Sequence, residues 1–267
     1  MAEDRFSQQS KVYAQFRPEY PKELFDFLGS LCKSHHLVWD CATGTGQAAR
    51  SLSTLFERVI ATDLSAEQIS HASAPSNVNF KVAQAEEVVA ANSTVDLVTV
   101  AQALHWFDLE VFYSNVKKAL TPNGIFAAWG YSFFTINQEV DEILDPYGRE
   151  FLRPYWSPKN WLLINGYKEI PFPFEKVETP EFKLTVDWNL SEVQGFLESW
   201  SATQKYKEAH GVNPIEKIWS SLKGAWGNDA EKKRVKWDLH LRVGKCLSIV
   251  WGTLCFLSEP RLNPFLL

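Results

Sequence analysis

Residues 37–47 combine an apolar run, an acid and a glycine-containing turn in one short segment. Leu37, Val38 and Trp39 predict a buried strand, Asp40 follows it, and Gly44-Thr45-Gly46 predicts a tight turn into a helix. Backbone at such a turn approaches a ligand closely, because glycine has no side chain in the way. This order predicts an α/β fold that binds a nucleotide-like cofactor at the strand end.

Asp40 discriminates between two classes of cofactor, dinucleotides and S-adenosylmethionine, that the glycines alone do not distinguish. Residues 44–49 satisfy the G-x-G-x-x-G/A pattern of dinucleotide sites. A carboxylate just before the turn would repel a pyrophosphate docked at the helix N-terminus. The same carboxylate favours the ammonium and sulfonium groups of S-adenosylmethionine. We therefore expect S-adenosylmethionine, and an NAD-dependent oxidoreductase is the less favoured alternative.

A second acid, Asp63, ends the next apolar run and precedes Leu64. An acid about 20 residues after a glycine turn suits a ribose diol, because one carboxylate accepts two hydroxyl hydrogen bonds. Ser65 then predicts a helix N-cap, with Gln68 three positions later as in a capping box. Asp63 is therefore expected at the edge of the sheet where open α/β folds bind ligands.

Strands and helices alternate through the first half of the chain. This alternation predicts a doubly wound, mostly parallel sheet. Strands are expected at 37–39, 58–63, 78–82, 95–100 and 125–129, and a turn is expected at 121–124. Helices are expected at 21–32 and 47–56. Two more helices are expected to begin at residue 65 and at residue 109, the latter with Asp108 as its N-cap.

With these motifs in place, the chain resembles the class I S-adenosylmethionine-dependent methyltransferases. More narrowly, it resembles the small-molecule group of trans-aconitate methyltransferases and uncharacterised plant and fungal relatives. Residues 40–46 match D-x-G-x-G-x-G except that Ala42 stands at the first glycine. Residues 13–21 resemble the Y-x-x-x-R-P-x-Y-P entry segment, and residues 101–108 resemble the A-x-H-W-F/M-D segment. The resemblance implies a Rossmann-like seven-stranded methyltransferase fold.

The resemblance also implies roles for individual residues. The entry segment would close over the cofactor, with Tyr13 and Arg17 as lid residues and Arg17 paired with a methionine or substrate carboxylate. Gln84 and Ala85 resemble the adenine motif, although Gln84 stands where an acid is usual. The expected cofactor-binding set is Tyr20, Asp40, Ala42, Gly44, Gly46, Asp63, Leu64, Gln84, Ala85, Ala101 and Trp106.

His105 is the candidate catalytic residue. It is expected at the end of the fourth strand, facing the methyl group. A histidine with an ordinary pKa of about 6.5 suits a general base. The alternative is that His105 only orients the loop or a ligand, and a carboxylate acceptor would need no base because it is already ionised at neutral pH.

The second half of the chain changes character and is rich in aromatic residues. We expect residues 1–130 to form the cofactor-binding part, 131–234 a cap or substrate insertion, 235–244 the last sheet strand, and 245–267 an atypical tail. Within the insertion, residues 182–188 predict a strand, and residues 190–207 predict one helix with Ser191 as a possible N-cap. Most of the aromatic residues are expected to fill a core, and some to line an apolar substrate cleft.

Composition narrows the class of protein and its partners. A net charge of −5 argues against a nucleic-acid surface. The four cysteines lack metal-ligand spacing and fit reduced thiols, so we expect a cytoplasmic protein without a metal. The apolar stretch near the C-terminus is too short for a membrane span.

The expected function is methyl transfer to a small molecule. The expected alternative is a protein that binds S-adenosylmethionine without catalysing methyl transfer. The sequence leaves the acceptor and the oligomeric state open.

Overall fold

The computed structural model describes residues 17–247 and confirms the expected α/β fold. Tyr13 and residues 248–267 of the predicted tail lie outside the described residues. Within the described range, no helix combines the length and the apolar character that crossing a membrane requires. The same range holds no group of three or more His, Cys, Asp or Glu side chains placed to share a metal ion.

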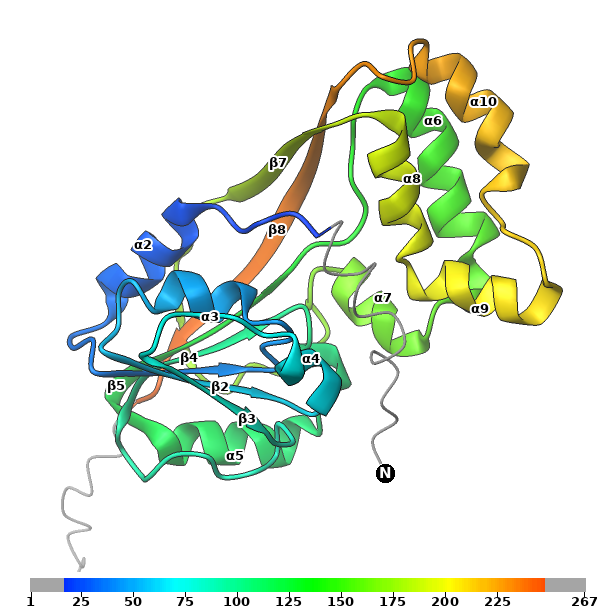
Figure 1. The fold of residues 1–267 in the computed structure, drawn as a ribbon. Coiled ribbons are helices and arrows are strands. Elements are labelled where there is room, and N and C mark those ends of the chain that lie inside the picture. Colours follow the sequence, from blue (N-terminus) through cyan, green and yellow to red (C-terminus); the bar gives the residue numbers. More distant parts are fainter. Residues whose placement is uncertain (1–16, 248–267) are drawn as a thin grey trace, which may run out of the picture.

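A mostly parallel sheet forms the body of the first half of the molecule (Figure 1). Its order is β3-β2-β1-β4-β5-β8-β6, and only β8 runs against the others. The order reverses between β1 and β4, which is where doubly wound sheets bind ligands. The strands are β1 (Leu37–Cys41), β2 (Arg58–Asp63), β3 (Val78–Val82), β4 (Val95–Ala101), β5 (Leu120–Gly130), β6 (Glu175–Val177), β7 (Phe182–Trp188) and β8 (Lys233–Lys245).

Helices cover both faces of this sheet, so its central strands are apolar on both sides. Successive residues alternate between two cores: Val38 belongs to the core beneath α2 (Lys22–Leu31) and α3 (Gln47–Leu52), and Trp39 belongs to the core over α5 (Leu109–Ala119). Every residue of β1 is buried as a result, including its acid, Asp40. The short helix α4 (Ala66–Ser70) follows β2, with Ser65 accepting from the Gln68 amide as its N-cap.

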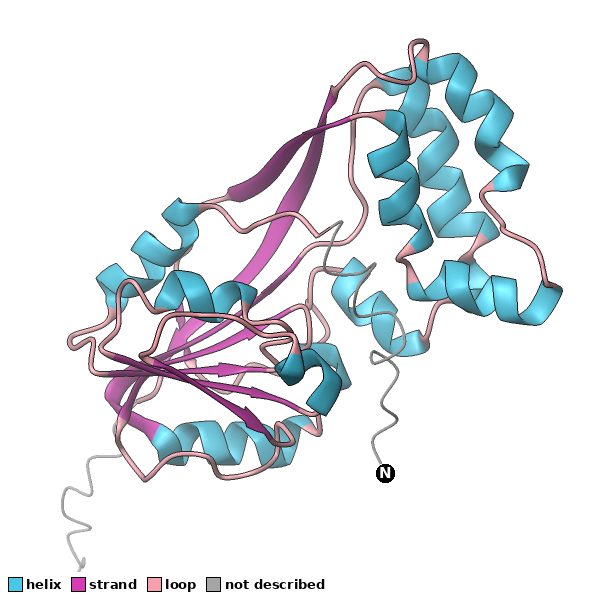
Figure 2. Ribbon diagram, in the orientation of Figure 1, coloured by secondary structure: helices cyan, strands magenta, loops and turns pink. Residues whose placement is uncertain are grey.

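A long two-stranded ribbon joins the sheet to a separate group of helices (Figure 2). The second half of β8 pairs with β5 and β6, and its first half pairs with β7. The ribbon leads to a group of helices at the far end from α5, and we call this group the helical cap (Figure 1). The cap helices are α6 (Gln138–Pro146), α8 (Leu190–Glu198), α9 (Ser201–His210) and α10 (Glu216–Trp226), with α7 (Pro158–Ile164) between them and the sheet.

The single helix expected over 190–207 is wrong, because the chain turns at Ser199 and Trp200. Trp200 has an extended backbone with ψ 133°, which ends α8 and starts α9. The hydroxyls of Ser199 and Thr203 donate to carbonyls at the end of α8, at 2.6 and 2.8 Å, and so stabilise the corner. Ser191 is not the N-cap. Asn189 caps α8 instead, in a capping box with Glu192.

Three other boundaries differ from the sequence-based expectation. The helix expected over 47–56 ends at Leu52. The last strand is longer than expected, Lys233–Lys245, because its first half has β7 as a partner. Residues 121–124 form an irregularity within β5 rather than a turn before it, and Asn123, with φ 66°, takes the left-handed conformation there.

Candidate functional site

A cavity opens at the carboxyl ends of β1 and β4, where the strand order reverses. We call it the cofactor cavity. It brings together the entry segment, the glycine turn and the residue that ends β4. Its lining includes five predicted cofactor residues: Tyr20, Asp40, Ala42, Gly44 and Ala101.

Asp40 lines this cavity with only 1 % of its surface exposed. Its two carboxylate oxygens accept hydrogen bonds from the hydroxyls of Thr43, at 2.5 Å, and Thr99, at 2.7 Å. Burial raises the pKa of Asp40 to about 6, although both hydroxyl hydrogen bonds oppose that rise. At neutral pH the group is therefore mostly ionised, and it places a negative charge where solvent stabilises it poorly.

The glycine turn depends on left-handed backbone at three alternate positions. Ala42, Gly44 and Gly46 have φ values of 55°, 57° and 84°. Gly44 and Gly46 adopt this conformation at little cost, whereas a residue with a Cβ atom is strained there. A Cβ at Gly46 would also lie 2.8 Å from the Phe80 ring. The first position of the motif therefore requires a left-handed backbone as well as a small side chain, and Ala42 adopts that backbone with the strain that its Cβ atom brings.

Asp63 anchors the turn from the neighbouring strand. Its carboxylate accepts from the backbone N–H of Gly44 and of Ser65, both at 2.8 Å. Asp63 therefore lies beside the glycine turn at the rim of the cofactor cavity, although it does not line that cavity. Four other predicted residues do not line it either: Gly46, Leu64, Gln84 and Ala85. The Gln84 backbone N–H donates to Glu87 instead.

The described part of the entry segment lines the cofactor cavity through Arg17, Glu19 and Tyr20. Gln47, in α3, donates to the carbonyl of Pro18 at 2.8 Å and so fixes the segment to the glycine turn. The Tyr20 ring packs edge-on against the Trp129 ring, 5.5 Å between centroids. Arg17 donates to the Tyr131 hydroxyl at 3.2 Å and lies 5.7 Å from the centre of that ring.

A second cavity lies between the sheet edge and the helical cap, and we call it the acceptor cavity. Arg17, Gln102 and Tyr131 line both cavities, so the two meet at these residues. Trp106 lines the acceptor cavity and not the cofactor cavity. The other described residues that line it include no Asp or Glu; they are His105, Ser132, Phe133, Trp156, Asn160, Leu163, Ile164, Phe196, Ser199, Trp200 and Ser201.

His105 is held as a neutral imidazole in the wall of the acceptor cavity. It is 4 % exposed, and its Nδ1 atom lies 3.2 Å from the Tyr167 hydroxyl. Burial, with a smaller effect of Lys159, lowers the pKa of His105 to about 3. Lys159 also donates to the Trp106 carbonyl at 2.9 Å, and this hydrogen bond connects α7 to the turn that carries His105 and Trp106. An imidazole that resists protonation so strongly is a weak base for proton abstraction.

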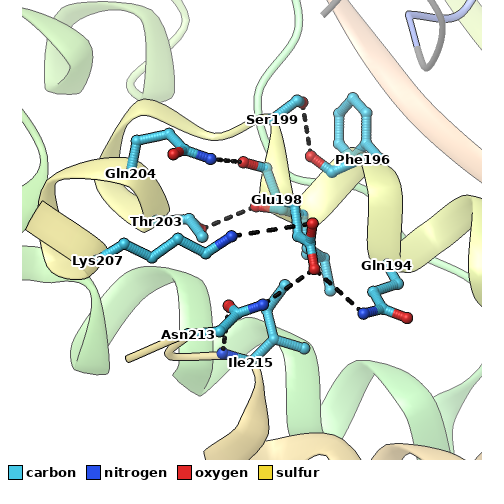
Figure 3. Close-up of polar contacts among 10 residues, drawn as sticks. Gln194, Phe196, Glu198, Ser199, Thr203, Gln204, Lys207, Asn213 and Ile215 are labelled. Carbon is cyan, nitrogen blue, oxygen red and sulfur yellow. Dashed lines mark hydrogen bonds and ion pairs between the residues drawn. The ribbon is translucent and has the colours of Figure 1, made fainter. Parts of the chain in front are cut away.

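The cap side of the acceptor cavity is positioned by a polar network at the α8–α9 corner (Figure 3). Glu198 is its centre and accepts from Gln194 at 3.1 Å and from Asn213 at 2.9 Å, with Lys207 at 3.8 Å. Gln204 donates to the Glu198 carbonyl at 2.6 Å. The network holds the corner from which Ser199, Trp200 and Ser201 face the cavity.

Comparison with known proteins identifies the family. A family model described as a methyltransferase domain matches residues 39–128. A Dictyostelium discoideum protein assigned as a methyltransferase is 31% identical over 251 residues, covering 92% of this chain and 95% of the relative. The chain belongs to the class I S-adenosylmethionine-dependent methyltransferases.

A solved structure from Anaeromyxobacter dehalogenans, assigned as a type II methyltransferase, supports this membership. It is 34% identical, with a TM-score of 0.81, over 86% of this chain and 98% of that one. A Saccharomyces cerevisiae protein described as a probable S-adenosylmethionine-dependent methyltransferase is 30% identical over 46% of this chain and 45% of its own length. Methyl transfer and the use of S-adenosylmethionine are therefore properties of this family member, and the narrower likeness to trans-aconitate methyltransferases is not confirmed.

The cavity at β1 and β4 fits this methyl donor. A buried carboxylate suits a cationic ligand, and a glycine turn permits close backbone approach. Sequence reasoning missed Gln102 and Tyr131, which join the two cavities, and the corner residues Ser199 and Trp200. Gln102 lies inside the recognised segment 101–108, so its place there was the only available signal.

Proposed function

We propose that this methyltransferase transfers the methyl group to the carboxylate of a small acid with an apolar body. The observation that carries the proposal is the charge of the acceptor cavity: among residues 17–247, its lining contains Arg17 and no Asp or Glu. An anionic acceptor is favoured in such a site, and a cationic amine is not. The aromatic rings of Phe133, Trp156 and Trp200 suit a flat apolar body.

The cofactor roles expected from the sequence become part of this proposal. Tyr20, Asp40, Ala42, Gly44 and Ala101 would hold the methionine end and the centre of the donor, since they line the cofactor cavity. Asp63 would accept the ribose hydroxyls, because it lies beside the glycine turn and each oxygen of a carboxylate can accept more than one hydrogen bond. Leu64, Gln84 and Ala85 would contact the adenine beyond the rim, and Gly46 would only shape the turn.

The chemistry requires positioning and little else from the protein. Bound S-adenosylmethionine supplies a methyl group on a sulfonium. The acceptor oxygen forms a bond to that methyl carbon as the carbon–sulfur bond breaks, the electron pair goes to sulfur, and no proton moves. Holding the reacting atoms in line is worth about 7–11 kcal/mol in favourable cases. Arg17 would bind the acceptor carboxylate, and the cap would exclude water.

His105 would position the acceptor rather than act as a base. Its pKa of about 3 makes it a poor base, and an ionised carboxylate has no proton to lose. One ring nitrogen of His105 faces the Tyr167 hydroxyl, which leaves the other for the loop or the acceptor. Trp106, as a wall of the acceptor cavity, would orient the apolar body beside the methyl group.

The test compares matched acceptors that differ only in the reacting group. Methyl-labelled S-adenosylmethionine is incubated with enzyme and 3-phenylpropanoate, 3-phenylpropanol or 3-phenylpropylamine, and then with a wider series of aromatic acids. The proposal expects label in acids as methyl esters, which alkali cleaves to volatile methanol. Label in the alcohol or the amine, with none in any acid, would contradict it.

A further inference from the structure

Gln102 occupies the place where the methyl group must pass from one cavity to the other. It follows directly after β4 and lines both the cofactor cavity and the acceptor cavity, as only Arg17 and Tyr131 also do among the described residues. A donor in the first cavity and an acceptor in the second can react only where the two meet. A side chain at this junction therefore contacts the reacting groups or the atoms beside them.

The backbone of Gln102 is fixed in an unfavourable conformation. Its φ of 61° lies in the left-handed region, where a residue with a Cβ atom is strained. Its N–H donates to the Trp129 carbonyl of β5 at 2.8 Å, which holds the strand end in place. Strained residues of this kind are concentrated at functional sites, where the surrounding structure maintains them.

The side-chain amide nitrogen of Gln102 is buried without the partners that it requires. Its Nε2 atom is inaccessible to water and has no hydrogen-bond partner among residues 17–247. An amide nitrogen carries two N–H donors, and burying them unpaired is costly. The amide also packs tightly against β5, because a Cβ at Gly130 would lie 2.9 Å from Gln102 Oε1. The described part of the fold thus packs closely around this amide and provides no hydrogen-bond partner for its nitrogen.

We propose that the Gln102 amide donates to the acceptor carboxylate and sets the chain's preference for acids. This inference rests on the proposed function. The amide would bind the carboxylate oxygen that is not methylated, while Arg17 balances the charge, so that the other oxygen faces the methyl carbon. The two N–H donors of an amide suit an anionic oxygen, and rotation of the Gln102 side chain into the acceptor cavity, which it lines, would give the unpartnered Nε2 atom an acceptor.

The test uses two variants of nearly equal size. Gln102→Met removes the donors and keeps the volume, and Gln102→Glu replaces them with a group that repels an acid when it is ionised. We expect Gln102→Met to raise KM for an aromatic acid by roughly tenfold to a hundredfold, the effect of losing one hydrogen bond to a charged group. Gln102→Glu should raise KM further, and the Kd for S-adenosylmethionine should change less than threefold in both.

Gln138→Met is the matched control, because Gln138 is exposed on α6 and its amide donates to Glu142 at 2.9 Å. It should leave both constants unchanged. An unchanged KM for the acid in Gln102→Met would overturn the role of Gln102. If the Kd for S-adenosylmethionine also rose in that variant, the amide would bind the methyl donor rather than the acid. If the unaltered enzyme labels no acid at all, the proposed function fails first, and the two failures remain distinct. Cofactor binding by each variant verifies that it is folded.

Discussion

Replacing Asp40 by Asn should make the ligand-free protein more stable and a weaker binder of its cofactor. Asp40 is fully buried, and burial raises its pKa from the usual 3.8 to about 6. An amide of the same shape carries no charge, so it avoids the cost of burying one. The hydroxyls of Thr43 and Thr99 can each donate or accept, and they can therefore serve an amide as they serve a protonated carboxyl.

The size of the effect follows from the pKa. A rise of about two units corresponds to about 3 kcal/mol of stability lost when the group is ionised. The folded state binds the proton more tightly than the unfolded state, so Asp40 makes the protein less stable as pH rises from about 4 to about 6. Asp40→Asn should therefore gain about 3 kcal/mol over the unaltered protein at pH 7, and the gain should fall to nearly zero by pH 4.

Urea unfolding of both proteins at pH 7, 5.5 and 4 measures this difference directly. Asp96→Asn is the matched control: Asp96 is also buried, but its oxygen accepts from the backbone N–H groups of His36 and Leu37 at 2.9 and 3.1 Å. That variant should be destabilised by about 1–3 kcal/mol, because an amide N–H could face those donors. An Asp40→Asn protein that is less stable at pH 7, or a gain that does not change with pH, would refute the reasoning.

Three further predictions follow from single residues. Ala42→Gly should stabilise the protein by about 1 kcal/mol in urea unfolding, because Ala42 has φ 55°; a destabilised variant would contradict the conformational role of the first motif position. Gly130→Ala should cost about 1–3 kcal/mol, since its Cβ would press on Leu163 and Gln102, whereas Gly224→Ala, at an exposed position of α10, should stabilise slightly; equal effects would disprove the crowding at Gly130. Cofactor affinity should fall as pH drops below about 6, because Asp40 becomes protonated. This pH dependence should persist in His105→Asn and disappear in Asp40→Asn. Its loss in His105→Asn would assign the ionisation to His105 instead.

The sequence was sufficient for the parts of the molecule that short-range patterns determine. Apolar runs followed by Asp40 and Asp63 predicted two strands of a mostly parallel sheet, and the structure contains both, as β1 and β2, paired in parallel. The caps at Ser65 and Asp108 are confirmed, because a cap depends on only four consecutive residues. The segment over 190–207 was misjudged because helical periodicity continues across Trp200, where tertiary contacts turn the chain.

The acceptor cavity was beyond the reach of sequence patterns. Its lining extends from Arg17 to Ser201 and combines the entry segment, the end of β4 and the cap. No local spacing brings such residues together. The neutral state of His105 could not be predicted from the sequence either, because its pKa depends on burial by residues distant in the chain.

The most direct test is a crystal structure of the enzyme with S-adenosylhomocysteine and an aromatic acid that it methylates. We predict that the sulfur lies at the junction lined by Arg17, Gln102 and Tyr131, with the acid carboxylate opposite it in the acceptor cavity and within hydrogen-bond distance of the Gln102 amide. A sulfur directed away from that junction, or an acid bound outside the acceptor cavity, would contradict it.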